Sequence, residues 1–187
     1  IISDMDLLAF DFPKVNLNTD KKTILNFVEE QYLGGINLPE EISLQAKAKG
    51  QIDDLTAELA LDTEMGKIIF DGSFKNREQI FFVANLKVDQ LQLGNLLGNS
   101  GLDTLTFDIH SSGSGTSMDN LTAELSSNFD RLKIYGNDYS GLILEGQLEN
   151  GVGDVTLALE DEYLDFRLLT KLDLDSINSK VDLNLDV

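Results

Sequence analysis

The sequence of 187 residues contains no cysteine, no tryptophan, one histidine and only two prolines. Without cysteine the chain cannot form disulfides, thiolate metal sites or a redox motif, and this composition suits an oxidising compartment in which free thiols are a hazard. No apolar run approaches the roughly 18 residues that a membrane-spanning helix needs. The chain begins at Ile1 and ends within a predicted strand, so we expect a segment of a longer protein, and no signal peptide is visible.

Basic residues are scarce as well, because 14 Lys and Arg stand against 33 Asp and Glu, which gives a net charge of −19. Nucleic-acid binding requires cations that displace counterions from phosphates, so this class of function is disfavoured. Broad docking on an anionic membrane surface is disfavoured for the same reason. We expect the acidic charge to form a solvated outer surface. A hydrophobic content of 42% nevertheless predicts an ordered chain with a core.

What the sequence has in abundance is the alternation of apolar and polar residues. Over 42–49 the even positions are Ile, Leu, Ala and Ala, and the odd positions are Ser, Gln, Lys and Lys. The same period of two recurs over 55–62, 142–148, 164–168 and 177–187, and turn signals such as Asn150-Gly151 separate the runs. The pattern predicts many antiparallel strands, each with one apolar face.

Helical spacing is confined to two places. Thr19 is a plausible N-cap, the apolar residues between Ile24 and Leu33 recur at helical spacing, and Gly34-Gly35 is a stop signal. These features predict one amphipathic helix over 20–33, with the role of an end plug, a lid or a docking element left open. A weaker helical turn is expected at 93–97.

One heptapeptide occurs twice with a single difference, as D-D-L-T-A-E-L at 53–59 and D-N-L-T-A-E-L at 119–125. The flanking patterns also recur, which predicts repeat units at 10–76 and 80–150 and a partial third unit at 151–187. The second unit has gained eight residues around 129–135. We expect a longer strand with a β-bulge there rather than an extra strand, because the apolar parity changes by one residue.

A helix of about 14 residues is roughly 21 Å long and cannot cover a sheet of about a dozen strands. The apolar face must therefore be buried in two packed sheets, in a closed barrel or in a curled open trough, and tandem repeats favour an elongated object. The predicted fold is mainly β: an elongated antiparallel β-meander curled into an open trough, with one short amphipathic helix. A trough of this kind could hold acyl chains. The predicted lining residues are Ile42, Leu44, Leu55, Leu59, Leu142, Leu144, Leu164, Phe166, Leu183 and Leu185.

Catalytic and metal-binding patterns are weak. His110 has serine neighbours but no placed partner, and we interpret it as a polar residue at a strand end. The segment 113–117, G-S-G-T-S, lacks the Lys of a phosphate-binding loop and is predicted to be a flexible turn. A weak calcium site is the alternative hypothesis for Asp173, Asp175, Asp182 and Asp186, but their alternation with Leu and Val predicts a solvated strand face. We therefore predict a protein that is not an enzyme and that uses no metal or cofactor.

Six stretches together resemble the AsmA/TamB-like family of the Gram-negative envelope. They cover nearly all of the chain and consist of strand, turn and short-helix patterns. The stretches are L-P-E-E-I-S-L-Q-A-K-A-K-G (38–50), D-D-L-T-A-E-L (53–59), G-K-I-I-F-D-G-S-F (66–74), L-K-V-D-Q-L-Q-L-G-N-L-L-G (86–98), L-D-T-L-T-F-D-I-H-S-S-G-S-G (102–115) and Y-G-N-D-Y-S-G-L-I-L-E-G-Q-L (135–148).

The resemblance implies a taco-like β-trough in the periplasm, within a protein anchored in the inner membrane, and no active-site residues. It implies phospholipid transport between the two membranes or, alternatively, assistance in assembling outer-membrane β-barrel proteins. A TamA-type outer-membrane partner would bind through regions outside this chain. A glycan-acting enzyme is a third hypothesis, and it would need a polar cleft with converging carboxylates. The sequence leaves the oligomeric state open.

Overall fold

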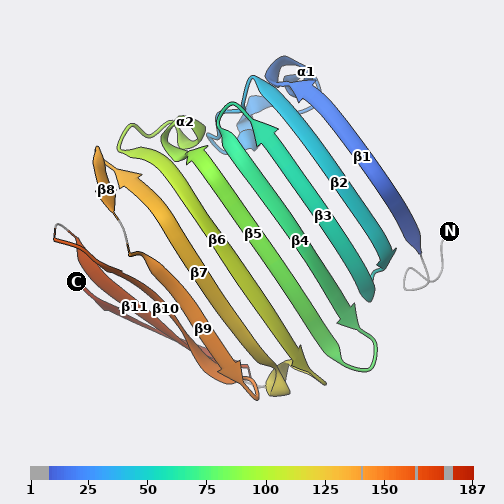
Figure 1. Ribbon diagram of the computed structural model, residues 1–187, viewed down its shortest axis with the longest axis vertical. Coiled ribbons are helices and arrows are strands. Elements are labelled where there is room, and N and C mark those ends of the chain that lie inside the picture. The colour runs from blue at the N-terminus through green and yellow to red at the C-terminus, as the bar shows by residue number, and fades with distance from the viewer. Residues whose placement is uncertain (1–8, 140, 163, 175–178) are drawn as a thin grey trace.

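The computed structural model describes residues 9–139, 141–162, 164–174 and 179–187. Within these ranges the chain forms one twelve-stranded sheet (Figure 1). The strands are β1 (Phe10–Asp20), β2 (Glu41–Gln51), β3 (Asp54–Thr63), β4 (Gly66–Asn76), β5 (Ile80–Gln92), β6 (Leu102–Gly115), β7 (Thr122–Ile134), β8 (Asn137–Tyr139), β9 (Ile143–Glu149), β10 (Val152–Glu160), β11 (Asp165–Asp173) and β12 (Lys180–Asp186).

Strand order follows chain order from β1 to β12, except that the short β8 lies beside β7 and off this path. All of these pairings are antiparallel. Short turns make this possible, and the β9–β10 turn is an example. Asn150 and Gly151 both have positive φ, 50° and 76°, as a two-residue hairpin turn that matches the strand twist requires. The predicted meander is confirmed.

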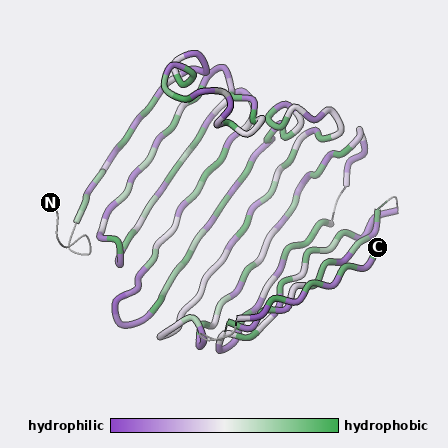
Figure 2. Tube along the Cα trace, turned by 180° about the vertical axis from the view of Figure 1, so that it is seen from behind, coloured by the Kyte–Doolittle hydropathy of each residue, from purple (hydrophilic) through white to green (hydrophobic). Residues whose placement is uncertain are grey.

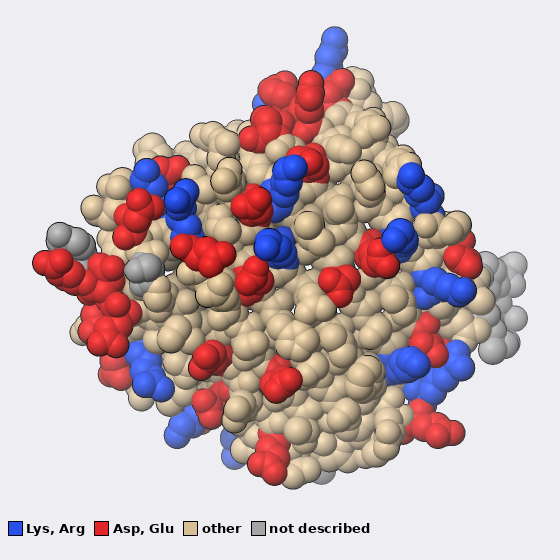
Figure 3. Space-filling model, viewed as in Figure 1, with Lys and Arg blue, Asp and Glu red and all other residues tan. Residues whose placement is uncertain are grey.

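The register brings most apolar residues of the strands to one face, because directly paired residues point to the same side of a sheet. One row runs Leu17, Leu44, Leu61, Ile68, Val88, Phe107 and Phe129 across seven strands, and we call it the central row. Figure 2 shows the resulting alternation along each strand. Charged side chains are spread over the opposite face, which is turned toward the viewer in Figure 3.

The sheet bends toward its apolar face. The exposure of adjacent, similar side chains on the two faces shows the direction of the bend. The three pairs are Ile68 with Ile69, Phe82 with Phe81, and Leu144 with Ile143. In each pair the first residue faces the apolar side and is half-buried, whereas the second faces the other side and is exposed. The apolar side is therefore the more crowded, concave side.

The sheet is not closed, because the described strands β1 and β12 each have only one neighbour. Figure 1 shows β10 and β11 turned nearly edge-on behind β9, relative to the broad sheet of β1–β7. The predicted curled, open trough is thus what the chain forms. No second layer lies within the described part, and accordingly few large side chains are buried, Val88, Leu148 and Leu159 among them.

The predicted helix over 20–33 is wrong. The chain instead forms α1 (Lys21–Leu25), an irregular stretch and a 3₁₀ turn at Glu30–Leu33. The N-cap is Asp20 rather than Thr19, and the stop at Gly34 is confirmed by its left-handed φ of 61°. The expected second helical turn is confirmed as α2 (Leu93–Leu97). Five residues make little more than one turn, and such helices have no stability without packing.

The predicted bulge in the second unit is confirmed. The β6–β7 register shifts between the pairs Phe107–Phe129 and Thr106–Arg131, so one extra residue of β7 lies opposite this step. The strand β8 was not predicted. Because β8 and β9 both pair antiparallel with β7, they run in the same direction, as two pieces of one interrupted strand. Strand direction is therefore preserved after the bulge, as expected.

Element order recurs along the chain. The series β1, α1, β2, β3, β4 is followed by β5, α2, β6, β7, β9. The two copies of the heptapeptide open β3 and β7, which hold equivalent places in the two series. The unit boundaries 10–76, 80–150 and 151–187 stay a prediction.

Candidate functional site: the apolar face of the sheet

The predicted lining residues lie on one face of the sheet. Leu44 pairs with Leu61 and Leu59 with Ala46, and the same face carries Ile42 and Leu55. Farther along, Leu144 pairs with Leu157, Phe166 with Leu159, and Leu185 with Leu168. Leu183 lies on this face opposite Thr170. Leu142, which is buried, and Leu164, which is half-buried, directly precede β9 and β11.

Sequence reasoning missed further members of this surface. Six residues join Leu44 in the central row: Leu17, Leu61, Ile68, Val88, Phe107 and Phe129. A second row runs Val15, Ala46, Leu59, Phe70, Leu86, Ile109 and Ser127. Their alternation was visible in the sequence. Only the register shows that they continue the same rows.

The apolar face carries no charge at any registered strand position within the described residues. Hydroxyl groups interrupt it at a few points, such as Ser111, Ser127 and Thr170. Ser127 also bridges the interruption between β7 and β9, because its hydroxyl accepts a hydrogen bond from the Leu144 N–H at 2.8 Å. The second row therefore meets the Leu144, Leu157, Leu168, Leu185 row of the C-terminal strands.

Aromatic rings lie flat on the middle of this face. A Cβ atom placed on Gly113 would be 2.5 Å from the Phe82 ring, and one on Gly72 would be 2.9 Å from the Phe70 ring. The rings therefore lie over the glycines instead of projecting into the trough. Phe107 and Phe129 stack at 5.1 Å between ring centroids. This packing makes a low, apolar floor.

The opposite face is held together by ion pairs directly across neighbouring strands. Lys47 and Glu58 are 2.6 Å apart, and Lys67 and Asp62 are 2.9 Å apart. The hydrogen bond from Lys67 to Asp62 raises the pKa of Lys67. Exposed pairs contribute little stability each, but opposite charges across strands favour this register over a one-residue slip.

The polar residues considered for chemistry lie on this charged face. His110 is within β6 and not at a strand end, so that prediction is wrong. Its Nδ1 lies 2.6 Å from Asn85 Oδ1, and Asn85 Nδ2 donates to Asp71 at 2.8 Å. All three side chains are at the surface. The predicted turn 113–117 is also partly wrong, because β6 continues to Gly115.

The acidic residues of the C-terminal strands face cations. Asp173, Asp182 and Asp186 are registered opposite Lys180, Lys171 and Arg167, while Asp175 lies outside the described residues. The described ranges contain no group of three or more His, Asp or Glu that could hold a metal ion. Within the same ranges, no helix is both long and apolar enough to cross a membrane.

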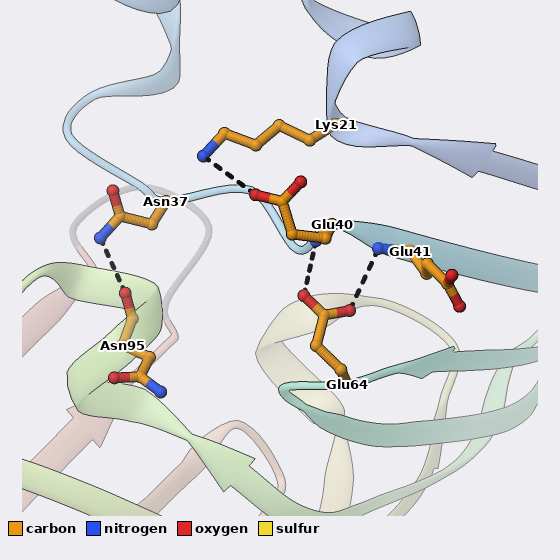
Figure 4. A network of polar contacts seen from close by, with 6 residues as sticks. All are labelled: Lys21, Asn37, Glu40, Glu41, Glu64 and Asn95. Atoms are coloured by element: carbon orange, nitrogen blue, oxygen red, sulfur yellow. Dashed lines mark hydrogen bonds and ion pairs between the residues drawn. The ribbon is translucent and has the colours of Figure 1, made fainter.

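The connector between β1 and β2, residues 26–40, is fixed by polar contacts at one end of the strands (Figure 4). Asn37 donates through its backbone N–H to Leu96 at 2.7 Å and through Nδ2 to Asn95 at 2.8 Å, which ties the connector to α2. The Glu64 carboxylate accepts the N–H groups of Glu40 and Glu41 at 2.5 and 3.1 Å.

Two carboxylates in this region have lowered pKa values. Desolvation acts to raise the pKa of Glu64, but the N–H groups of Glu40 and Glu41 outweigh it and lower that pKa. The Thr23 N–H, which donates to Asp20 at 2.6 Å, lowers the pKa of Asp20. Both groups are anchors of the connector and of α1, and neither points to catalysis.

Comparison of the chain with protein-family models, with curated proteins and with solved structures yields no match. The resemblance to the AsmA/TamB-like family therefore depends on the sequence stretches alone. What the geometry of the described residues defines is an open β-trough with an extended apolar face that carries no charge at a registered strand position and that no second layer of these residues covers.

Proposed function

We propose that this chain binds phospholipid acyl chains along the apolar face of its sheet and forms part of a conduit for lipids. The observation that carries the proposal is that the apolar face is continuous from strand to strand and open to solvent. The rows of the apolar face cross from β1 to β12 without a charged residue at any registered position of the described strands, and no second layer of the described chain covers them.

An acyl chain suits this surface better than a polypeptide does. Burial of one CH₂ group gains roughly 0.8 kcal/mol and needs no polar partner. An extended polypeptide would bring one N–H and one C=O per residue, and the few hydroxyl groups on this face could not satisfy them. Lipid head groups would remain in water along the open side of the trough.

The resemblance to the AsmA/TamB-like family supports the cellular setting of the proposal. In this setting the chain is an internal segment of a periplasmic protein anchored in the inner membrane of a Gram-negative bacterium. Phospholipids would move between the inner and outer membranes, and a TamA-type partner would bind elsewhere in the full protein. The absence of enzymatic activity stays a prediction.

Native mass spectrometry of the chain purified from a Gram-negative host tests the proposal. We expect protein species with the added mass of one or more phospholipids, released at higher collision energy. A chain that stays free of lipid after purification, and again after incubation with phospholipid in the absence of detergent, would contradict acyl binding.

A second candidate is a scaffold for outer-membrane β-barrel proteins, and the free edge of β12 favours it. All seven residues of β12 are exposed, and the β11–β12 register has no shift. In contrast, β1 carries Pro13 and a register shift between Phe12 and Val15, which protect an edge from pairing. Photo-crosslinking from Asn184 to an unfolded barrel protein would support strand addition. Lipid binding without such a crosslink would count against it.

A further inference from the structure

The outer edge of β12 has no neighbouring strand within the described residues, and it exposes apolar side chains. Val181, Leu183 and Leu185 lie on the apolar face and are 60%, 69% and 60% exposed. Two of their counterparts on β11, Leu168 and Leu172, are half-buried. These residues belong to the same face of the same sheet, so the difference reflects the strand that β12 lacks on its outer side.

A second copy of β12 fits this edge in an antiparallel pairing about a two-fold axis at Leu183. Residues equally far from Leu183 on either side are then paired, so the two Leu183 side chains meet and Val181 meets Leu185 of the second copy. Directly paired residues point to the same side of a sheet. All three apolar residues of one β12 therefore contact apolar residues of the other.

The polar face of the same pairing is complementary in charge. Lys180 lies opposite Asp186 of the second copy. Within one chain, Lys180 is registered opposite Asp173, and Asp186 opposite Arg167. From β11 of one copy to β11 of the other, the four strands thus carry a row of alternating sign: Asp173, Lys180, Asp186 and Arg167. Opposite charges directly across strands stabilise their pairing.

The remaining charged residue of β12 is Asp182, which is registered opposite Lys171 of its own chain. In the symmetric pairing it lies opposite the uncharged Asn184 of the second copy, and the two Asp182 side chains are only diagonal neighbours. An axis moved by one residue is less favourable. At Asp182 it would oppose the two copies of this acid, and at Asn184 it would oppose Asp182 to Asp186. The axis at Leu183 also pairs all seven residues of β12.

We propose that two copies of this chain associate through β12 into a symmetric dimer with one continuous sheet. Backbone hydrogen bonds join the two edge strands, as in other cases of strand addition, and the two-fold axis makes the interface self-complementary. The apolar faces of both copies then lie on the same side, which joins their troughs. The dimer occupies the edge that a client strand would use, and it needs no acyl chain, so it goes beyond the proposed function.

The net charge of −19 on each copy opposes this association at long range. At about 0.15 M salt, charges farther apart than about 8 Å are largely screened from one another. The paired charges at the interface lie closer together than this distance, so their attraction is screened less. The dimer should therefore be weak at low salt and stronger at physiological ionic strength.

The absence of cysteine permits a direct test with single-cysteine variants. Leu183→Cys should form a disulfide dimer under mild oxidation, because the two copies of this position meet at the axis. Val181→Cys alone and Leu185→Cys alone should not, since the two copies of either position lie about 14 Å apart along the strands, too far for a disulfide. An equal mixture of these two variants should cross-link as Leu183→Cys does.

A charge exchange tests the same pairing without cross-linking. Lys180→Glu alone and Asp186→Lys alone each oppose like charges at two symmetric places, so each should weaken the dimer by about tenfold. Their equal mixture again opposes unlike charges at both places and should recover the affinity. Each substitution disturbs its own β11–β12 hairpin equally in both experiments, so the gain on mixing reports the contact between copies. Sedimentation equilibrium at about 0.15 M salt measures the affinities.

Four results would overturn the proposal. They are a chain that sediments at its single-copy mass of 20.7 kDa even at millimolar concentration, equal cross-linking of Val181→Cys and Leu183→Cys, no gain on mixing the charge variants, and a preferred disulfide between Leu183→Cys and Leu17→Cys. The last would show head-to-tail addition of β12 to β1 of another copy. A single-copy species that still binds phospholipid would overturn the dimer and leave the proposed function standing.

Discussion

Charge placed at two paired positions of the central row should prevent acyl binding without unfolding the sheet. We choose Leu44→Asp with Leu61→Asp, because these residues are directly paired on the apolar face and are only half-buried. The matched control is Gln45→Asp with Ala60→Asp, a directly paired couple on the same two strands that faces the other side. Both variants add two negative charges and place Asp in the same strands.

The magnitude follows from the strand spacing. An extended 16-carbon chain is roughly 20 Å long, so across strands about 4.8 Å apart it contacts about four of them. Full burial of such a chain gains about 13 kcal/mol at most, and an open trough that covers one side gains about 6 kcal/mol. Loss of contact with two of four strands then costs about 3 kcal/mol, which is a weakening of about 150-fold in Kd.

The assay is displacement of a fluorescent fatty acid, with circular dichroism to verify that strand content is kept. We expect the apolar-face variant to lose affinity by about two orders of magnitude and the control to bind as the unaltered chain does. Equal affinities for all three proteins would refute the assignment of the apolar face as the binding surface. Equal losses in both variants would show that net charge, and not the face, governs binding.

Three further predictions concern stability and pH. Leu159→Ala should lower the free energy of unfolding by about 2–5 kcal/mol, because this side chain is 1% exposed, whereas Leu183→Ala on the exposed edge strand should change it by less than about 0.5 kcal/mol; urea denaturation measures both. Gly113→Ala should destabilise the sheet by about 1–3 kcal/mol by displacing the Phe82 ring, and a second change, Phe82→Leu, should recover part of the loss. The pKa of the Glu64 carboxyl should lie below the ordinary Glu value of 4.5 in an NMR pH series, and a midpoint at or above that value would contradict its double hydrogen bond.

The sign of the pH effect follows from the lowered pKa of Glu64. A carboxyl whose pKa is lower in the folded than in the unfolded state contributes stability that is complete above the unfolded value. That contribution is lost as the pH falls through the folded value. The contacts of Glu64 with Glu40 and Glu41 should therefore persist at neutral pH and loosen only in acid, below the ordinary Glu value of 4.5. Glu64→Gln should make the connector insensitive to this change.

Alternation alone placed the lining residues on one face, because the two-residue period of a strand follows from its pleat and from nothing farther away. It also located the bulge near Phe129, since a change of parity has few other causes. Neither inference needed knowledge of a partner strand. The continuity of the rows did need it, because register is a property of pairs.

The errors come from places where tertiary packing overrides local pattern. The spacing of Ile24 to Leu33 is helical, but Phe27 and Tyr32 are exposed to 86% and 75% and so add no packed apolar face to a longer helix. Only α1 and a 3₁₀ turn form. His110 was placed at a strand end because the run of serines and glycines after it looks like a turn. In the structure that run continues β6 to Gly115. Gly113 lies on the apolar face, where the Phe82 ring covers it and fills the space that a larger side chain at this position would occupy.

In the described structure β1 and β12 each have one side without a neighbouring strand, and the order strand–helix–strand–strand–strand recurs along the chain. The length of the trough can therefore change without a change in its width. A duplicated series would add four strands, or about 19 Å of length, without altering any existing side-chain contact. Each new strand would pair with the one synthesised just before it, so a longer array would still fold through local hairpins and keep a low contact order. The length of such a sheet is therefore set by the number of repeats alone.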